Sequence, residues 1–586
     1  MAIALLLIAY GLLILRSLSP TALTIKSRLL TDPFLQLPTQ DTVQVVWFTE
    51  FAGSNHVVEY GNRLEQRIAA TTTKLDRVRE DQQSHVGEQT EAGQIYSAPT
   101  YREIWRHEAT VTGLTSNARV PYRVKSTDDQ GTVIRSDRFT LAPAPTAGMA
   151  LKILLTSDHQ LKPLTPANLQ KVVETIGTVD AVFLAGDLVD IPDRASEWFD
   201  DNRGNAFFAS LQGRAAYDLE REGTTVRYQG GALIQSAPLF PALGNHEVMG
   251  RFSMEQPLGE QFNDPIPRQV ANQWYLQQAQ QINPASDPQI EQDWLKNNSF
   301  NSDTYEQIFS LPADSPGEEK YYAVSFGDVR LISLYVANIW RNPSLDSGAR
   351  GRYREKDGDL NDSTRWGYGQ HIFESIAPGS PQYEWLQAEL SKPEFQQAKY
   401  KIVMFHYPPH SVGDNIVPAY TDPVQIVDRF PEGQIKAVRY EYPLAADYLI
   451  RDVMPLLEEA GVQLVFYGHS HLWNRFVSPS GMHFLETSNV GNTYGAYTYT
   501  NQQRRPIPIG FSETYAAMGD PNGLSPVVPT ISPLLDENGQ PQPYIASNDI
   551  TIFSILDTGA GIVTSYRFDA RLPESATIKF DEFQLR

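Results

Sequence analysis

The sequence of 586 residues contains no cysteine. This absence excludes disulfide bonds, thiolate zinc sites, cysteine nucleophiles and a lipid anchor attached through cysteine. A site for hard divalent metal ions in this chain would be built from oxygen and imidazole ligands. The length is enough for two to four domains with a large core.

Basic residues are scarce relative to acidic ones. The chain has 48 Lys and Arg against 69 Asp and Glu, which gives a formal net charge of −21. Because nucleic-acid backbones are bound by Lys and Arg surfaces, we expect no nucleic-acid partner. A phosphate ester substrate is not excluded, since bound metal ions can supply positive charge locally.

An apolar run from Ala2 to Leu15 occupies the N-terminus and ends at Arg16. It is shorter than the roughly 20 residues of a membrane span and is typical of a secretory h-region. A basic n-region and a clear cleavage site are missing, so an uncleaved anchor and a buried core helix are the alternatives. We predict that residues 1–30 are a signal peptide or membrane anchor. The protein would then be exported: periplasmic, extracellular or tethered to a membrane by this segment.

Residues 38–145 have the pattern of an all-β domain. Apolar and polar residues alternate in TVQVVWFTE (42–50) and again in VPYRVKS (120–126). Several short strands at such spacing predict a β-sandwich of roughly 100 residues. The Pro-rich stretch APAPTAG (142–148) marks its boundary.

The pattern changes after this linker. LKILLTSD (151–158) and AVFLAGD (181–187) read as buried strands, and between them lies a helical stripe for which Thr165 is the expected N-cap. Strand, helix and strand predict a βαβ unit with two parallel strands. Because functional groups collect at the carboxyl ends of such strands, we expect Asp158 and Asp187 to lie side by side.

Residues 150–500 are predicted to form one α/β catalytic domain. Its segment 251–310 is rich in Gln, Asn, Trp and Tyr and predicts a helical insertion near the site, a solvated excursion being the alternative. Residues 501–586 are predicted to hold a Pro-rich loop and C-terminal strands that complete the domain, with a hairpin turn at 558–561.

Five short polar segments each follow an apolar run. They are SDHQ (157–160), GDLVD (186–190), GNHE (244–247), MFHYPPH (404–410) and GHSH (468–471). Two hard divalent ions a few ångströms apart need a bridging carboxylate and further oxygen and imidazole ligands, which Asp, Asn and neutral His supply. Each segment alone is a weak signal. All five in this order predict a two-metal site.

This order of segments resembles the motif series of the calcineurin-like metallophosphoesterase superfamily: D-x-H, GDxxD, GNH[DE], His and GHxH. A β-sandwich ahead of the catalytic domain, and segments such as QVVWFTE and GHSHLWNR, resemble the purple acid phosphatases. The resemblance covers roughly residues 40–500. It implies an α/β (α+β sandwich) metallophosphoesterase domain preceded by an all-β, fibronectin-III-like sandwich.

The resemblance also implies two divalent metal ions of the Mn, Fe or Zn class and a role for each matching residue. The implied ligands are Asp158, Gln160 and His471 for the first metal, Asn245, His406 and His469 for the second, and Asp187 as the bridge. His246 matches the family's catalytic histidine, which contacts phosphate and protonates the leaving alkoxide. The implied nucleophile is a metal-bound hydroxide.

Two positions depart from the family pattern. Gln160 stands where D-x-H has its histidine, and Asp190 stands where purple acid phosphatases have the tyrosine of GDxxY. The second departure argues against a purple ferric enzyme. The first replaces an imidazole by a neutral amide, which should weaken binding of the first metal ion and favour Mn²⁺ or Fe²⁺ over Zn²⁺. Asp190 stays an alternative ligand there.

Smaller predictions concern residues beside the motifs. We expect His159 to be structural rather than a ligand, Arg475 to form a salt bridge, Glu247 to orient backbone, His410 to contact substrate or lie in a solvated loop, and Trp274 and Trp294 to pack.

The function predicted from these features is an exported two-metal phosphoesterase that hydrolyses phosphate monoesters. A phosphodiesterase or nucleotide hydrolase of the same superfamily is the alternative among enzymes. A surface binding protein with a degenerate phosphatase domain is the non-enzyme alternative, and the intact ligand set argues against it.

Overall fold

The computed structural model describes residues 28–87, 89, 95–338, 354–413, 418–505 and 517–586. The apolar run at the N-terminus lies outside these ranges, so the prediction of a signal peptide or anchor is not tested here. Among the described residues, no helix has both the length and the apolar character needed to span a membrane.

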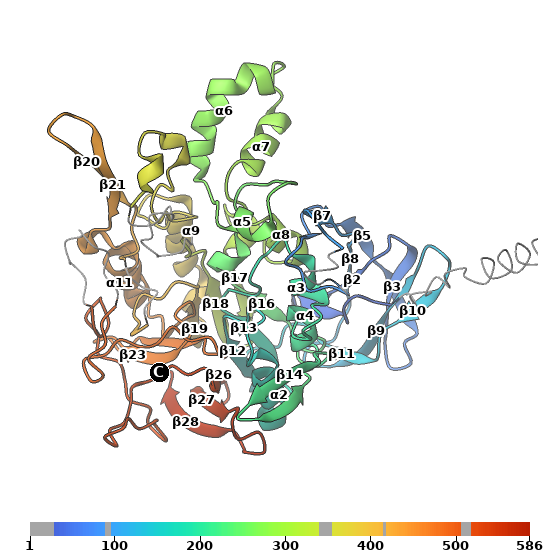
Figure 1. Cartoon of the computed structure of the whole chain (residues 1–586). Coiled ribbons are helices and arrows are strands. Elements are labelled where there is room, and N and C mark those ends of the chain that lie inside the picture. The colour runs from blue at the N-terminus through green and yellow to red at the C-terminus, as the bar shows by residue number, and fades with distance from the viewer. Residues whose placement is uncertain (1–27, 88, 90–94, 339–353, 414–417, 506–516) are drawn as a thin grey trace, which may run out of the picture.

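The N-terminal part is a sandwich of two antiparallel sheets (Figure 1). One sheet contains, in order, β1 (Phe34–Gln36), β2 (Val43–Thr49), β8 (Trp105–Val111) and β5 (Thr71–Lys74). The other contains β10 (Val133–Arg135), β9 (Val120–Thr127), β3 (Ser54–Tyr60) and β4 (Gln66–Ala69), with β11 (Phe139–Leu141) also paired to β9. Trp47, Val58 and Tyr122 meet in the core between the sheets. The predicted β-sandwich is confirmed, and the structure adds β1 ahead of the predicted range.

Two histidines are stacked inside this sandwich. The rings of His56 and His107 lie 3.8 Å apart at 16°. The two nitrogens of His107 contact the hydroxyls of Thr49, at 2.8 Å, and Thr72, at 3.0 Å. Burial, reinforced by the neighbouring His56, lowers the pKa of His107 to about 3, and burial also lowers the pKa of His56. The stack is therefore built from neutral imidazoles.

We expect acid to destabilise this sandwich through the histidine stack. Because the folded-state pKa of His107 is below its unfolded value of about 6.5, its stabilising contribution is complete above that pH and is lost as the pH falls. The melting temperature of the full chain should drop between pH 7.5 and 4.5, and less steeply in His107→Gln, whose side chain does not titrate. Parallel curves for the two proteins would show that the stack is not responsible.

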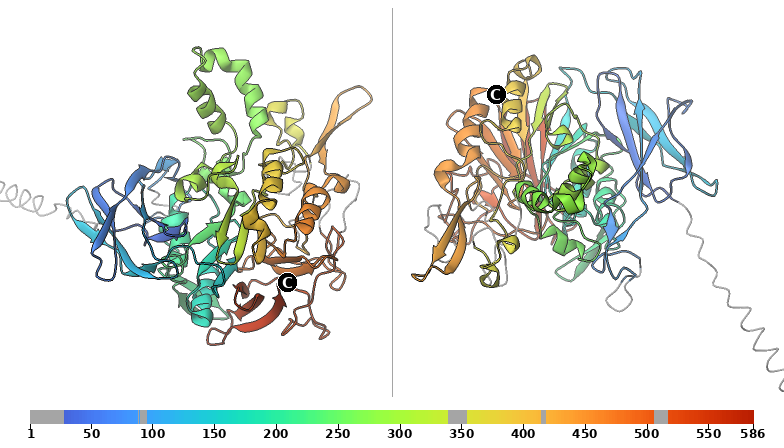
Figure 2. Two further views of the ribbon diagram at one scale, coloured as in Figure 1. Left: turned by 180° about the vertical axis from the view of Figure 1, so that it is seen from behind. Right: turned by 90° about the horizontal axis from the view of Figure 1, so that it is seen from above.

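The remainder of the chain forms two further sheets packed face to face, with helices outside (Figure 2). The first contains β16 (Leu239–Pro241), β13 (Ala181–Leu184), β12 (Lys152–Thr156), β26 (Ile550–Asp557), β27 (Ile562–Asp569) and β28 (Ile578–Gln584). The second contains β17 (Tyr322–Phe326), β18 (Val329–Ser333), β19 (Tyr400–Met404), β22 (Leu464–Tyr467), β24 (His483–Thr487), β23 (Trp473–Val477) and β25 (Tyr544–Ile545). Leu155 and Val182 of the first sheet share one buried core with Ile402 and Phe466 of the second.

The predicted βαβ unit is present. Strands β12 and β13 pair in parallel, Ile153 opposite Ala181, and α2 (Thr165–Ile176) connects them with a proline in its first turn. One detail is wrong: Leu164, not Thr165, precedes the helix, and no side chain caps it. The Thr165 hydroxyl instead donates to the carbonyl of His159 at 2.9 Å, inside the loop that follows Asp158.

The C-terminal strands join the first sheet. Strand β26 pairs antiparallel with β12, and β26 and β27 form a hairpin in which Asp557 lies opposite Ile562. The turn therefore falls at 558–561, where the sequence placed it. This arrangement puts the last part of the chain beside the strand that leads to Asp158.

Helices and small hairpins surround the two sheets. The outer face of the second sheet is covered by α9 (Pro381–Leu390) and α11 (Met454–Glu459). Shorter elements are β6 (Arg79–Glu80), β7 (Thr100–Tyr101), α3 (Ala195–Phe199), α4 (Phe207–Leu211), β14 (Tyr217–Arg221), β15 (Thr224–Tyr228), α10 (Pro393–Gln396), β20 (Val424–Arg429) and β21 (Ile435–Glu441).

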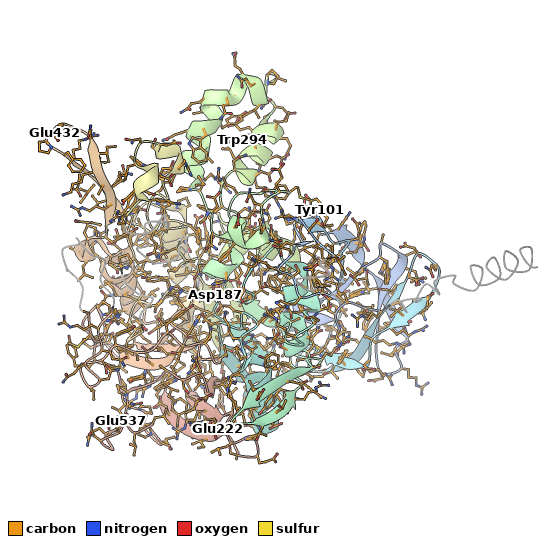
Figure 3. The ribbon with its side chains drawn as sticks, in the orientation of Figure 1. Tyr101, Asp187, Glu222, Trp294, Glu432 and Glu537 are labelled. Carbon is orange, nitrogen blue, oxygen red and sulfur yellow. The ribbon has the colours of Figure 1, made fainter. Side chains whose placement is uncertain are left out.

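The predicted insertion is helical. It contains α5 (Leu258–Phe262), α6 (Arg268–Ile282), α7 (Pro288–Asn297) and α8 (Asp303–Ile308). Helices α6 and α7 form a hairpin that projects from the body (Figure 1). Trp294 packs on Tyr275 within this hairpin, with ring centroids 5.5 Å apart, well away from Asp187 (Figure 3). Helix α5, in contrast, contacts the candidate site.

Candidate metal centre

All five polar segments lie where a strand of a central sheet ends. Asp158, Asp187 and the GNHE turn follow the parallel strands β12, β13 and β16. His406 and His469 follow the parallel strands β19 and β22 of the second sheet. Parallel strands end at the same edge of a sheet, so each sheet presents its polar segments at one edge. The two sheets pack about 10 Å apart, and side chains from both edges meet across this distance.

The loops that carry these residues have unusual backbone conformations. Five of the predicted site residues have positive φ angles: Asp158 (58°), Gln160 (36°), Asp187 (56°), His469 (82°) and His471 (54°). Such conformations are costly for residues other than glycine and gather at functional sites. The glycines of the motifs allow close approach: a Cβ at Gly244 would lie 2.2 Å from Asp187 Oδ1, and one at Gly468 would lie 2.3 Å from Asp158 Oδ2.

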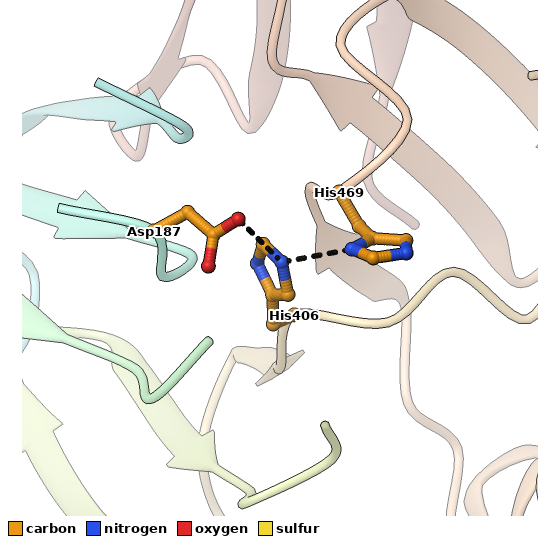
Figure 4. Close-up of side chains that lie close together, drawn as sticks. All are labelled: Asp187, His406 and His469. Atoms are coloured by element: carbon orange, nitrogen blue, oxygen red, sulfur yellow. Dashed lines mark hydrogen bonds and ion pairs between the residues drawn. The ribbon is translucent and has the colours of Figure 1, made fainter. Parts of the chain in front are cut away.

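One group of candidate metal ligands contains Asp187, His406 and His469, which Figure 4 shows, and Asn245 lies beside them. His406 Nε2 lies 3.1 Å from Asp187 Oδ2, 3.1 Å from Asn245 Oδ1 and 3.2 Å from His469 Nδ1. The other nitrogen, His406 Nδ1, lies 2.8 Å from the carbonyl of Ala185 and must donate to it. In a neutral ring Nε2 is therefore an acceptor, and it faces two oxygen acceptors.

A second group shares Asp187 with the first. Asp158, Asp187 and His471 each offer an atom within 4.8 Å of the others, and all three residues are buried. His471 Nε2 lies 3.2 Å from Asp158 Oδ1, while His471 Nδ1 lies 3.1 Å from the carbonyl of Asn492. The backbone N–H of His469 donates to both oxygens of Asp158 at 3.1 Å. Asp187 is thus the carboxylate common to both groups.

The donor set fits two divalent cations. Donors about 2.1 Å from a common ion are spaced by about 3.0–3.4 Å, which is the spacing around His406 Nε2. The need for positive charge is also visible in the electrostatics. Burial lowers the pKa of His406, but the charge and hydrogen bond of Asp187 outweigh burial and raise it to about 10. His406, His246 and His469 in turn lower the pKa of Asp187 despite its burial.

Gln160 and Asp190 differ in where their side chains lie. Gln160 Nε2 donates to Asp187 Oδ2 at 2.9 Å, and Gln160 Oε1 is buried without a hydrogen-bond partner. The carboxylate of Asp190 is 37% exposed and pairs with Lys162 Nζ at 2.6 Å. Of these two candidates, Gln160 is therefore the one beside the shared carboxylate. Its buried Oε1, which accepts no hydrogen bond, could instead coordinate a cation.

Replacing Gln160 by the histidine of the D-x-H motif should strengthen zinc binding. Gln160→His should raise the affinity of one site for Zn²⁺ about tenfold or more, because imidazole is a softer and stronger donor than an amide oxygen. Titration of apo-protein with Zn²⁺ and with Mn²⁺ would measure this. Asp190→Asn is the matched control and should leave both affinities unchanged. Equal affinities for Gln160→His and the wild type would show that Gln160 does not face the first metal.

His246 lies beside the shared carboxylate and is held from two sides. Its backbone N–H donates to Asp187 Oδ1 at 3.0 Å, and its Nδ1 donates to the carbonyl of Asp190 at 2.7 Å. The ring of Phe262, from α5, lies 5.1 Å from the imidazole. With the Nδ1 proton committed to Asp190, Nε2 is the atom that can take up or give a second proton.

Three buried glutamates hold the ligand loops by their backbones. Glu247 accepts from the N–H groups of Gly244, Asp187 and Leu188 at 2.7–2.9 Å, as its predicted role requires. Burial, followed by the charge of Asp187, raises its pKa to about 8. The sequence analysis missed the other two. Glu197 accepts from the N–H groups of Asp190 and Ile191, and Glu486 accepts from the N–H of Ser470, each bond being 2.8 Å.

The minor candidates lie outside the ligand cluster. His159 contacts the Thr156 hydroxyl at 2.9 Å, and Arg475 pairs with Asp581 at 2.8 Å, both in agreement with the predictions. His410 does not lie in a solvated loop, one of its two predicted alternatives: it is buried and pairs at 2.7 Å with Asp520, a carboxylate in the C-terminal loop region. This pair fastens that region to the segment carrying His406.

Comparisons with known proteins identify the family of the catalytic domain and a similar fold. The family model described as calcineurin-like phosphoesterase matches residues 151–472. Purple acid phosphatase PPD1 from yellow lupin (Lupinus luteus) seeds matches with a TM-score of 0.50 and 14% identity, over 94% of this chain and 73% of the lupin chain. GAP50 of Plasmodium, described as the anchor in the inner membrane complex, matches with a TM-score of 0.30 and 11% identity, over 75% of this chain and 90% of that one. No curated protein sequence matches.

The lupin structure is similar in fold, at an identity too low to say more. Together with the family model it confirms the predicted fold class: a catalytic domain of packed sheets preceded by a β-sandwich. The metallophosphoesterase fold implies a two-metal site, and the clusters around Asp187 are compatible with it.

Proposed function

The chain belongs to the calcineurin-like phosphoesterase family, and we propose that it hydrolyses phosphate monoesters as an exported two-metal enzyme. The observation that supports this most strongly is the position of Asp187, whose carboxylate is common to both groups of candidate ligands. A single shared carboxylate between two sets of nitrogen and oxygen donors is the arrangement that a pair of divalent cations requires.

The candidate ligands divide between the two positions. Asp158, His471 and Asp187, with Gln160 beside them, would hold one cation; Asn245, His406, His469 and Asp187 would hold the other. Two bound cations would supply positive charge that stabilises the phosphoryl oxygens and would activate water as the nucleophile. The protein's own contribution is to fix these donors on loops anchored by Glu247 and Glu486.

His246 is proposed to act on the leaving group. Its Nδ1 proton is held by the carbonyl of Asp190, so Nε2 of the protonated ring is the atom that would donate to the departing alkoxide. Donation at that atom completes cleavage of the ester P–O bond, and the alcohol leaves neutral. The contact with Phe262 fixes the plane of the ring.

A paired assay tests this proposal. The purified full chain should contain two metal ions per molecule by mass spectrometry and should hydrolyse p-nitrophenyl phosphate faster than bis(p-nitrophenyl) phosphate. The reverse preference would identify a phosphodiesterase. Two ions without turnover of either ester would identify a binding protein with a degenerate phosphatase domain. Fewer than two ions in an active enzyme would overturn the two-metal proposal.

Export is proposed on the apolar run alone. If residues 1–30 direct the chain across a membrane, then full-length protein expressed in bacteria should be recovered outside the cytoplasm. A mature N-terminus beyond the run would identify a signal peptide, and an intact one in the membrane fraction an anchor. Recovery of the intact chain in the cytoplasmic fraction would contradict export.

A further inference from the structure

A short segment in the connection between β5 and β8 of the N-terminal sandwich enters the interface with the catalytic domain close to His246. This segment is Arg79–Asp81, which contains β6. The side chain of Arg79 has no exposed surface. Its guanidinium donates to Asp193 Oδ2 at 2.6 Å, to the Ser253 carbonyl at 2.8 Å and to Gln261 Oε1 at 3.1 Å. One residue of this connection therefore joins the loop after β13 to the start of the insertion.

Asp81, at the other end of the segment, is also fully buried. Asp81 Oδ2 accepts the backbone N–H of Leu258, the first residue of α5, at 2.8 Å. Both oxygens of Asp81 also lie within reach of Arg194 Nη2, at 3.3 and 3.5 Å. Buried charges are costly unless they are paired in this way, so each contact is fixed in position by the others.

The first connection to His246 runs through Arg194. Arg194 Nη1 donates to Glu197 Oε1 at 2.7 Å. Glu197 Oε2 accepts the backbone N–H groups of Asp190 and Ile191, each at 2.8 Å. The carbonyl of Asp190 is the acceptor for His246 Nδ1. Asp81 is thus linked to the histidine by four successive polar contacts.

The second connection runs through α5. This helix is bonded at its first residue to Asp81 and through Gln261 to Arg79. Its last residue, Phe262, places its ring 5.1 Å from that of His246. The first connection therefore holds the acceptor of the hydrogen bond from His246 Nδ1, and the second holds the aromatic ring that packs against the same imidazole.

We propose that Arg79 and Asp81 are positioning residues for His246, so that the N-terminal sandwich sets the orientation of the catalytic domain's leaving-group acid. The inference rests on the proposed function of His246. Loss of Asp81 would free the Asp190 loop and α5 together and allow the imidazole to rotate away from the departing oxygen. A displacement of about 1 Å in a reacting group is enough to cost about 10²-fold in rate.

The test compares esters that differ in their need for a proton. In Asp81→Ala, kcat for an alkyl phosphate should fall about 10²-fold, while kcat for p-nitrophenyl phosphate, whose leaving group needs no proton, should fall much less. Asp81→Asn keeps an oxygen for the Leu258 N–H and should recover part of the loss. Arg106→Met is the matched control: Arg106 also crosses the domain interface, but to Ser310 and the carbonyl of Ile308. Its kinetics should be unchanged.

Coupling to His246 gives a second criterion. If Asp81 acts through His246, the double variant with His246→Ala should be no slower on the alkyl ester than His246→Ala alone. Equal slowing of both esters by Asp81→Ala, or additive losses in the double variant, would mean that Asp81 only holds the domains together, and would overturn the proposal.

A spectroscopic measurement separates this inference from the proposed function. Nuclear magnetic resonance of the protein labelled with ¹⁵N-histidine should show that the neutral imidazole of His246 in the wild type carries its proton on Nδ1. The variant His246→Gln, which lacks this signal, would assign it. Asp81→Ala and Arg79→Lys should give a mixture of tautomers, and Arg106→Met should not. An unchanged His246 signal in the first two would overturn the inference. If the wild type hydrolysed neither ester, the proposed function would be wrong. The comparison of His246 tautomers between the wild type and these variants would still show whether Arg79 and Asp81 position the imidazole.

Discussion

Asp187→Asn is expected to leave the protein with one metal ion or none and to remove measurable phosphatase activity. The carboxylate of Asp187 is common to both candidate ligand groups and lies 3.1 Å from His406 Nε2. The amide of asparagine has one oxygen in place of two and carries no charge. It can neither bridge two cations nor screen their mutual repulsion. The amide nitrogen would also point its N–H groups at the cations, which need ligand atoms with free lone pairs.

The matched control for this variant lies on the same loop. Asp190→Asn makes the same chemical change three residues later, where the carboxylate pairs with Lys162 at the surface. Its metal content should remain two ions per molecule by mass spectrometry. Two tightly held ions in Asp187→Asn would mean that another group forms the bridge, and the assignment of ligands around Asp158 would have to be rebuilt.

The parts of the fold that the sequence predicted are local. Strand, helix and strand at 152–184 and the hairpin at 558–561 follow from periodicity and turn residues within short windows. The five polar segments were visible because each sits directly after an apolar strand. What periodicity could not predict is that β26 pairs with β12, since nothing in either strand encodes a partner about 400 residues away.

The groups that support the site were harder to predict than the ligands. Glu486 accepts from Ser470 of the GHSH segment because β24 lies beside β22, a parallel pairing that only the folded sheet creates. Asp520 reaches His410 from a Pro-rich region that reads as loop. Arg79 and Asp81 look like surface charges in the sequence and are buried only because the two domains meet there. Long-range contacts of this kind leave no periodic signal.

His246→Ala is expected to slow hydrolysis of alkyl phosphates by ~10²–10⁴-fold, the scale of general acid catalysis, while both metal ions remain bound. His246 belongs to neither candidate ligand group, and its Nδ1 is bonded to the Asp190 carbonyl rather than directed at the cluster. The loss should shrink for p-nitrophenyl phosphate, whose leaving group is stable without a proton. Rates for the two esters and the metal content of each variant would measure these effects.

A second substitution separates the proton from the scaffold around it. In His246→Asn the amide nitrogen can take the place of Nδ1 and keep the bond to Asp190, but nothing replaces Nε2. If Nε2 delivers the proton, His246→Asn should be as slow as His246→Ala on alkyl esters, even with the loop intact. Recovery of the rate in His246→Asn would show instead that the histidine serves the loop. Loss of metal from either variant would show that the histidine helps to bind the cations. Either result would mean that His246 is not the acid that protonates the leaving group.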